Sequence, residues 1–238
     1  MLKCIRLVSE FMKYSYRFII IAALFVTCLL TANIIAVKVW SLGSVELSAA
    51  VIIFPFSYIF GDILTEVYGY KEARKIIWLG FLCNLLFVIF AWFAQLLPPV
   101  SGWTGQSAFV TILGYTPRLL GASFLGYLAG EFANSFVLAK MKIFTKGRWL
   151  WSRTIGSTVI GQALDTGIFI VGAYVGAVFF TPWMILWAWA AKVIIEVAFT
   201  PLTYVIVNYL KKNEAVDTYD FQTNFNPLHL SERKPAER

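Results

Sequence analysis

Positively charged residues alternate with long apolar segments along this chain, in phase from end to end. Of the 20 lysines and arginines, 17 lie before the first apolar segment, after the second, after the fourth, or after the sixth. The other three connections between the segments carry none. Because positively charged loops stay in the cytoplasm, the pattern predicts an even number of membrane-spanning helices with both chain ends cytoplasmic.

Six apolar segments fill most of the chain, and each is long enough to cross a bilayer, which takes about 20 residues. A content of 59% hydrophobic and 14% charged residues excludes an ordinary soluble domain. We predict an all-α polytopic membrane protein whose six transmembrane helices form one bundle. The predicted spans are 17–39, 48–68, 76–97, 117–138, 154–180 and 183–210.

Three domains follow from these spans: a basic cytoplasmic N-terminus (1–16), the transmembrane bundle (17–212) and a polar, partly disordered cytoplasmic tail (213–238). The connection 98–115 holds an apolar piece too short to span, so we expect an interfacial or re-entrant segment on the outer face. We predict a multi-pass protein of the cell membrane.

Charge and motif content also narrow the classes of function. A net charge of +7 would indicate nucleic acid in a soluble protein, but here topology and anionic lipid account for it. We therefore expect a lipid bilayer and no nucleic acid as partner. The sequence has no glycine-rich phosphate loop and no paired metal-ligand spacing, and its single histidine, His229, lies in the tail. We predict no enzyme activity, no catalytic residues, no cofactor and no metal site.

Ionisable and polar residues interrupt the apolar spans at helical spacing. Tyr58, Asp62 and Glu66 recur every four residues and so share one helix face. Such groups cost at least ~2.5 kcal/mol each at the bilayer centre, so they usually face the bundle interior and carry function. We expect a polar cavity lined by these candidate substrate-binding residues: Asn33, Lys38, Tyr58, Asp62, Glu66, Arg118, Glu131, Asn134, Gln162, Asp165, Lys192 and Glu196.

Structural roles remain open for several of these residues. Lys192 and Glu196, at i, i+4, would suit an intrahelical ion pair. The Arg118 side chain would extend to the outer surface and place its guanidinium in water, and Glu66 would be exposed to water at the cytoplasmic end. Three amides would act as interhelical hydrogen-bond donors and acceptors: Asn33, Asn134 and Gln162. Two glycine pairs at four-residue spacing predict close helix packing: Gly126–Gly130 and Gly172–Gly176.

The two deepest acidic residues, Asp62 and Asp165, are predicted to face each other across the cavity. They also leave open an intramembrane aspartyl protease, although neither lies in a recognisable catalytic motif.

Short motifs follow one another along residues 31–210: Asn33-Ile-Ile-Ala-Val-Lys38, Phe54-Pro-Phe-Ser-Tyr58, Asp62-Ile-Leu-Thr-Glu66-Val-Tyr-Gly69, Thr116-Pro-Arg118, Ala122-Ser123, Asn134, Arg153, Ser157-Thr158, Gly161-Gln162, Asp165-Thr166, Lys192, Glu196 and Pro201. Together they resemble the queuosine precursor transporter family, also called the vitamin uptake transporter family. The resemblance implies a six-helix importer in the bacterial inner membrane. Its substrates would be 7-cyano-7-deazaguanine and 7-aminomethyl-7-deazaguanine, precursors of the tRNA base queuosine.

The residue chemistry agrees with such a substrate. A carboxylate accepts the ring N–H and exocyclic amine of a deazaguanine together, and an aromatic side chain stacks on its ring. An importer of another vitamin-like or nucleobase-like solute, a non-transporting membrane protein and an intramembrane hydrolase remain alternatives. The sequence leaves open whether transport uses an ion gradient, facilitated diffusion or a separate energising partner, and whether the chain forms a homo-oligomer.

Overall fold

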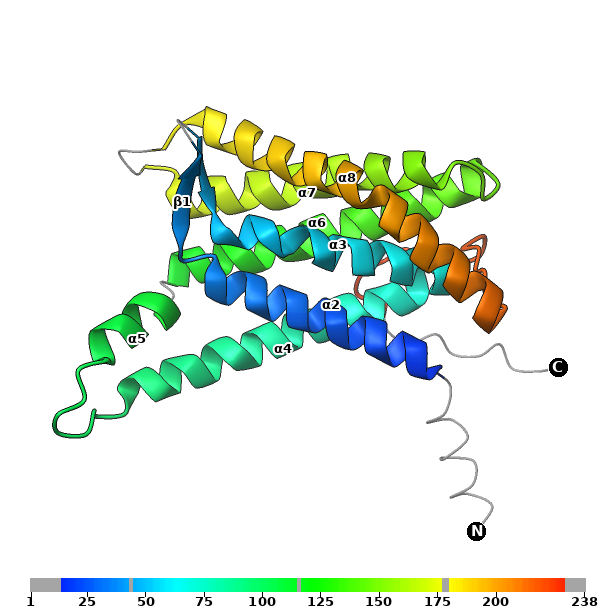
Figure 1. The fold of residues 1–238 in the computed structure, drawn as a ribbon. Coiled ribbons are helices and arrows are strands. Elements are labelled where there is room, and N and C mark those ends of the chain that lie inside the picture. The colour runs from blue at the N-terminus through cyan, green and yellow to red at the C-terminus, as the bar shows by residue number, and fades with distance from the viewer. Residues whose placement is uncertain (1–13, 43–44, 115–116, 177–179, 230–238) are drawn as a thin grey trace, which may run out of the picture.

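A bundle of long helices forms the body of the protein, as the computed structural model shows for residues 14–42, 45–114, 117–176 and 180–229 (Figure 1). Six helical segments are long and apolar enough to cross a membrane, which confirms the predicted all-α membrane bundle. The elements are α2 (Tyr16–Ile35), β1 (Val39–Leu42), β2 (Val45–Ser48), η1 (Ala49–Ile52), α3 (Phe54–Ile63), η2 (Leu64–Tyr68), α4 (Tyr70–Leu96), α5 (Gln106–Leu113), α6 (Pro117–Phe144), α7 (Leu150–Tyr174) and α8 (Pro182–Glu214).

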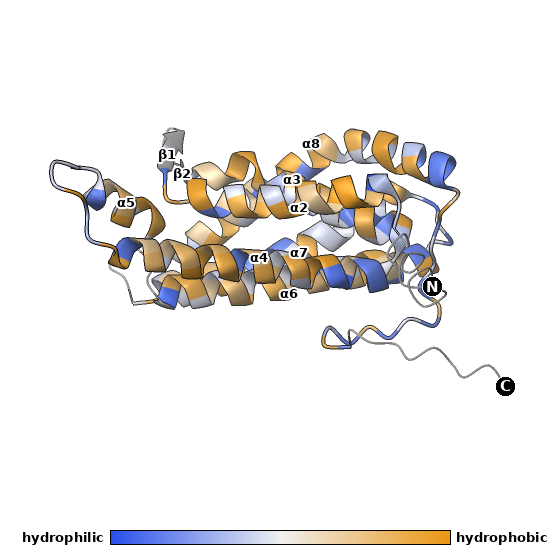
Figure 2. Cartoon of the chain, turned by 90° about the horizontal axis from the view of Figure 1, so that it is seen from below, coloured by the Kyte–Doolittle hydropathy of each residue, from blue (hydrophilic) through white to orange (hydrophobic). Residues whose placement is uncertain are grey.

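Hydrophobic residues predominate along the helices, which are mostly orange in Figure 2, and many large apolar side chains are exposed on the outside of the bundle. Large residues such as Phe90, Leu125 and Ile194 are more than half exposed, as expected for side chains that face lipid. Between α2, α3 and α4 the core is built from Phe25, Ile63 and other fully buried apolar residues.

The helices extend beyond the predicted spans at the basic end of the bundle. Helix α4 begins at Tyr70 rather than at residue 76, and α6 ends at Phe144 rather than at 138. The added turns contain Arg74 and Lys142, both buried. A hydropathy pattern predicts that a span ends at the first cations. In the structure these buried cations have polar partners, so the helix continues through them.

A β-hairpin that the sequence analysis did not predict connects the first two spans at the other end of the bundle (Figure 1). Strands β1 and β2 pair antiparallel, with Trp40 opposite Leu47. The valines and tryptophan of this segment favour strands. The Ser48 hydroxyl then accepts a hydrogen bond from the Ala50 backbone N–H and starts η1.

The second span is a composite of three helix types. It begins with the 3₁₀ turn η1, continues as α3 with Pro55 in the first turn, and ends in the π-helix η2. Gly69, with φ of 87°, takes a conformation that favours glycine and ends the span. Single-turn π-helices are frequent at functional sites, and η2 contains Glu66.

Helices α6 and α7 approach closely at their glycines. A Cβ atom added to Gly130 would lie 2.6 Å from the Asp165 Cβ, and one added to Gly172 would lie 2.8 Å from the Ala122 Cβ. The predicted close packing is confirmed for Gly126, Gly130 and Gly172. It is wrong for Gly176, where an added Cβ would meet no atom of the described residues within 4 Å.

Helix α5 lies at the periphery of the bundle, at the end that carries the hairpin, and contacts the end of α4 (Figure 1). It has eight residues and no buried side chain, and at 1.5 Å per residue it is too short to cross a bilayer. The segment predicted to be too short to span is thus a short helix, and its interfacial or re-entrant position stays a prediction.

Residues 215–229, which we name the C-terminal strap, pack against the basic end of the bundle. Asp220 is buried and accepts a hydrogen bond of 3.0 Å from the Tyr70 backbone N–H, and the Trp78 indole donates to the Pro227 carbonyl at 2.9 Å. The Arg74 guanidinium donates to two strap carbonyls, at 2.7 and 2.8 Å. Residues 215–229 are therefore ordered, and the predicted partial disorder of the tail is untested for 230–238, which lie outside the described part of the chain.

Candidate functional site

Polar side chains from four helices meet inside the bundle. They come from one face each of α3, α6, α7 and α8, where the spacing of three or four residues stacks them along each helix. All except Lys192 are buried. We name this set the central polar cluster: Tyr58, Asp62, Glu131, Asn134, Gln162, Asp165, Lys192 and Glu196.

The carboxylates of the cluster are close enough to interact electrostatically. Glu131 interacts with Asp165, with Glu196 and with Asp62. The Tyr58 hydroxyl lies beside them, since a Cβ added to Gly130 would be 2.8 Å from this oxygen and 2.6 Å from the Asp165 Cβ. Asp62 and Asp165 therefore belong to one cluster, with Glu131 interacting with both.

Two hydrogen-bonded pairs connect the helices within the cluster. The Asn134 amide donates to one Asp62 carboxylate oxygen at 2.7 Å and joins α6 to α3. The Lys192 ammonium donates to Asp165 at 2.8 Å and to the Thr166 hydroxyl at 3.2 Å, and it lies 4.0 Å from the centre of the Phe54 ring. Lys192 thus pairs with the neighbouring helix α7. The intrahelical alternative is wrong: Lys192 and Glu196, both described, form no ion pair.

Many polar atoms of the cluster have no hydrogen-bond partner among the described residues. Most buried polar atoms in native proteins have at least one partner, and leaving one unpaired costs about 1–3 kcal/mol. A concentration of unpaired acceptors in one place therefore indicates a site for a ligand with several donors. The atoms are the Tyr58 hydroxyl, Asp62 Oδ2, both Glu131 oxygens, Asn134 Oδ1, Gln162 Oε1 and both Glu196 oxygens.

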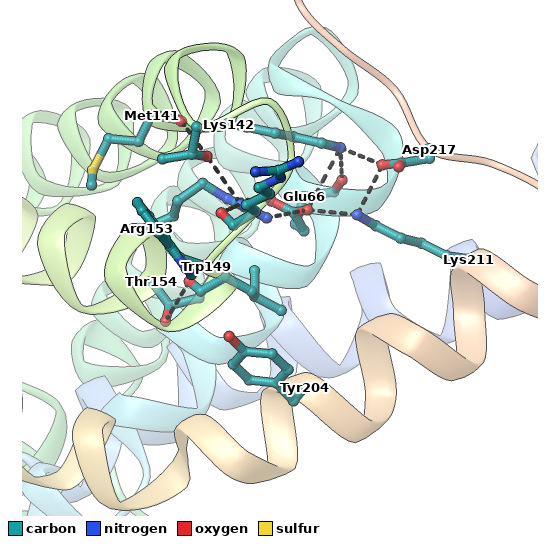
Figure 3. Close-up of polar contacts among 12 residues, drawn as sticks. Glu66, Met141, Lys142, Trp149, Arg153, Thr154, Tyr204, Lys211 and Asp217 are labelled. Atoms are coloured by element: carbon teal, nitrogen blue, oxygen red, sulfur yellow. Dashed lines mark hydrogen bonds and ion pairs between the residues drawn. The ribbon is translucent and has the colours of Figure 1, made fainter.

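A second polar network closes around Glu66 at the basic end of the bundle (Figure 3). The Arg153 guanidinium donates to both Glu66 oxygens, at 2.8 and 3.3 Å, and the Lys211 ammonium donates at 2.6 Å. Lys142 lies 3.7 Å from the same carboxylate. Glu66 is fully buried, so the alternative of a solvent-exposed Glu66 is wrong. It ties η2 to α6, α7 and α8.

The C-terminal strap joins this network through Asp217. Its carboxylate accepts hydrogen bonds from Lys142 at 2.6 Å and from Lys211 at 2.8 Å. Burial alone would raise the pKa of Asp217, but the hydrogen bonds and charges of the two lysines outweigh burial, so its pKa lies below the usual range. Asp217 is therefore a carboxylate at neutral pH and bridges the two cations.

The sequence matches a family of transporters over most of its length. The family described as "Putative vitamin uptake transporter" matches residues 48–206, which include every member of the central polar cluster. The chain belongs to this family.

Two curated proteins are similar in sequence to this chain. The "Probable queuosine precursor transporter" of Bacillus subtilis (strain 168) is 34% identical over 148 residues, 61% of this chain. The match spans 64% of that relative's length, less than two thirds. The "Queuosine precursor transporter" of Escherichia coli (strain K12) is 28% identical over 170 residues, 68% of this chain and 73% of the relative. No solved structure matches the chain.

Four candidate residues of this transporter-family chain lie outside the central polar cluster. Glu66 belongs to the ion-pair network described above. Lys38 is exposed beyond the end of α2, and Asn33 is half-buried on α2. The Arg118 guanidinium donates to the Gly172 carbonyl at 2.7 Å and to the Val175 carbonyl. Cations interact favourably with the carbonyl groups that end a helix, so Arg118 stabilises the end of α7 rather than reaching the carboxylates.

Sequence reasoning named Thr158 and Arg153 only within the motifs of the resemblance, and it missed their polar roles together with most of the ion-pair network. Thr158 is buried on α7 with an unpaired hydroxyl. Its place four residues before Gln162 was the signal, because it continues the same helix face. Arg153 and Lys142 looked like ordinary loop cations, since only tertiary contacts bring them to Glu66.

A hollow of about 260 Å³ lies at the hairpin end of the bundle, between α4 and α5. Its lining includes Pro98, Trp103 and Phe109 and contains no member of the central polar cluster. Buried unpaired acceptors are stronger evidence for a specific polar ligand than an apolar hollow, so we place the candidate site in the cluster.

Proposed function

We propose that this protein imports 7-deazapurine precursors of queuosine, such as 7-cyano-7-deazaguanine and 7-aminomethyl-7-deazaguanine, for tRNA modification. Family membership and the names of the two relatives support transport of this substrate class. The observation that carries the proposal is the central polar cluster, where unpaired carboxylate and amide oxygens meet inside a membrane bundle. An ionisable group at such depth is usually part of a substrate or ion pathway.

Glu196 is the acceptor that fits the substrate best. A deazaguanine presents a ring N–H and an exocyclic amine side by side, and a carboxylate accepts both in bidentate fashion. Asp62 already receives the Asn134 amide on one oxygen, whereas both oxygens of Glu196 and of Glu131 are unpaired and buried. Of these two, only Glu196 lies on the same helix as Lys192, one turn away. We assign the donor edge of the substrate to Glu196.

The substrate carbonyl and ring find partners one helical turn away. Lys192 precedes Glu196 by four residues on the same face of α8, so its ammonium can donate to the carbonyl next to the ring N–H. Phe54 lies against Lys192, and its ring is 5.5 Å from that of Tyr58. These rings supply the aromatic surface on which a flat heterocycle stacks.

We place the basic end of the bundle at the cytoplasmic face of a bacterial inner membrane. The C-terminal strap and the turn between α6 and α7 lie at this end, and the hairpin and α5 lie at the opposite end (Figure 1). Positively charged connections stay cytoplasmic, so both chain ends are assigned to the cytoplasm.

Uptake in living cells tests the proposal. Cells unable to make or import deazaguanine precursors would receive the protein and labelled 7-cyano-7-deazaguanine, and queuosine would be measured in their tRNA. We expect the wild-type chain to restore queuosine, Asp62→Asn to reduce it at equal protein abundance, and Lys38→Gln, an exposed control, to behave as wild type. Absence of queuosine in cells with abundant wild-type protein would refute the proposal. Inhibition of uptake by an unrelated vitamin would favour the alternative, an importer of another vitamin-like solute.

A further inference from the structure

Glu131 is the carboxylate of the central polar cluster that has neither a proposed substrate contact nor a hydrogen-bond partner among the described residues. Its side chain is buried on α6, and both of its oxygens lack a hydrogen-bond partner among the described residues. One oxygen lies against α3, since a Cβ added to Gly61 would be 3.2 Å from Glu131 Oε2. Glu131 is therefore held between helices, away from bulk water.

The charge of the cluster is far out of balance when every group is ionised. Asp62, Glu131, Asp165 and Glu196 would contribute four negative charges, and Lys192 one positive charge, which leaves a net charge of −3. A buried carboxylate without a charge partner is strongly disfavoured and takes up a proton instead. Asp165 has the counter-charge of Lys192 and Asp62 accepts a hydrogen bond from Asn134, whereas Glu131 has neither among the described residues.

The groups that face Glu131 add repulsion rather than a counter-charge. The neighbouring acids Asp165 and Glu196 interact with it unfavourably when all are ionised. The Tyr58 and Tyr127 hydroxyls are also near, and Tyr127 already donates to the Ile77 carbonyl at 2.8 Å. Titratable and charged groups around Glu131 are Tyr58 and Asp62 on α3, Cys83 on α4 beside Tyr127, Tyr127 on α6, Asp165 on α7, and Lys192 and Glu196 on α8.

From this geometry we infer that Glu131 is a proton-binding site and that each imported substrate molecule is accompanied by one proton held there. The inference rests on the proposed import of a 7-deazapurine. A proton on Glu131 removes one negative charge next to Glu196, so that Glu196 stays ionised and accepts the two substrate N–H groups. Substrate and proton then bind more tightly together than either does alone, which is the linkage that coupled transport requires.

Each transport cycle moves one substrate molecule and one proton inward. The proton enters Glu131 from the outer side, crosses with the substrate, and leaves to the cytoplasmic side, with no bond made or broken in the substrate. A neutral substrate then carries one positive charge inward. At one proton per substrate, each unit of pH difference supports about tenfold accumulation.

Purified protein in sealed lipid vesicles tests this inference with radiolabelled 7-cyano-7-deazaguanine as the probe. With the outside more acidic than the inside, the wild-type protein should accumulate the probe above its outside concentration, and an inside-negative potential should increase the accumulation. Glu131→Gln, which mimics the protonated side chain, should equilibrate the probe without accumulating it. Glu72→Gln, on α4 and paired with Lys75, is the matched control and should accumulate like wild type.

The outcomes separate the coupling from the proposed function. Three outcomes would overturn the role of Glu131 without affecting the proposed import. The wild-type protein could equilibrate the probe regardless of the pH gradient, it could accumulate the probe only with a sodium gradient, or the Glu131→Gln variant could accumulate it fully. Failure of folded wild-type protein to move or bind the probe would overturn both. Should Glu131→Gln not fold, alkalinisation of the outside medium on addition of probe to wild-type vesicles decides the question, since coupled entry consumes outside protons.

Discussion

Lys192 shows how a single side chain in the bundle can have either a structural or a transport role. Its ammonium is bound by Asp165 across the α7–α8 interface and rests on the Phe54 ring. Removal of one partner from a buried ion pair costs about 3–5 kcal/mol, because the other charge is left uncompensated. Lys192 is 17% exposed and Asp165 8%, so we expect a loss near the lower end of this range.

The pair can be tested with a double-mutant cycle on protein abundance and uptake. Lys192→Met and Asp165→Asn should each lower the amount of folded protein in the membrane, and the double variant should recover it. Because we assign the substrate carbonyl to Lys192, the double variant should still fail to accumulate substrate. Recovery of full uptake in the double variant would remove both residues from the transport site.

At this scale the sequence was informative about faces and less so about partners. Helical spacing correctly placed Tyr58, Asp62 and Glu131 inside the bundle, because a polar group on a lipid-facing side would be too costly. The partner of Lys192 was not predictable from spacing, since Glu196 and Asp165 are both within reach and only the packing of α7 against α8 decides between them.

Helices α6 and α7 depend on glycine where they cross. A Cβ added to Gly161 would lie 2.8 Å from the Asn134 Cβ and 2.9 Å from the Gly130 carbonyl. Overpacking of this kind costs about 1–3 kcal/mol, and it would also displace the Asn134 amide from Asp62. We expect Gly161→Ala to lower both thermal stability in detergent and uptake.

The same helix provides the control for this change. An added Cβ at Gly167 would have no atom of the described residues within 4 Å, and alanine is favoured over glycine within a helix by about 1 kcal/mol. Gly167→Ala should therefore match or exceed wild-type stability. Equal stability of the Gly161→Ala and Gly167→Ala variants would argue against the close approach of the two helices.

The C-terminal strap is predicted to loosen in acid. Burial raises the pKa of Asp217, but Lys142 and Lys211 together lower it by more, so that this pKa lies below its usual value in the folded protein. The stabilisation is thus fully present above the unfolded value of about 4 and is lost as the pH falls through the lower folded value.

Thermal unfolding in detergent, followed as the pH is lowered below about 4, measures this effect. Asp217 is 42% exposed, so its pairs contribute at most about 1 kcal/mol, or about 2–4 °C in Tm. Asp217→Asn should have a lower Tm than wild type at neutral pH and should lose less on acidification. An identical acid response of the two proteins would exclude Asp217 as the sensitive group.

At the scale of elements, hydropathy and charge located all six spans but did not predict the β-hairpin or the ordered C-terminal strap. The β-hairpin and the C-terminal strap are both polar or short enough to look like connections. The strap is ordered because Asp220 and several carbonyls meet donors on α4, notably Arg74 and Trp78, about 150 residues earlier in the chain. No local pattern in residues 215–229 encodes these partners.

The whole bundle has a direction, set by the segregation of its cations. A reporter enzyme active only outside the cytoplasm should be silent when it is fused after Leu210, and active when it is fused at Val100 in the connection between α4 and α5. Activity after Leu210 would invert the proposed orientation, and with it the side from which Glu131 takes its proton.

The central claim is that unpaired acceptors inside the bundle bind a deazaguanine, and direct binding to the purified protein tests it most directly. Calorimetric titration with 7-cyano-7-deazaguanine would compare wild type, Glu196→Gln and the exposed control Lys38→Gln. Loss of a hydrogen bond to a charged group costs about 1.5–3 kcal/mol, so Glu196→Gln should bind about tenfold or more weakly. Lys38→Gln should bind as wild type does. Wild-type affinity in folded Glu196→Gln protein would contradict the assignment of the substrate to this carboxylate.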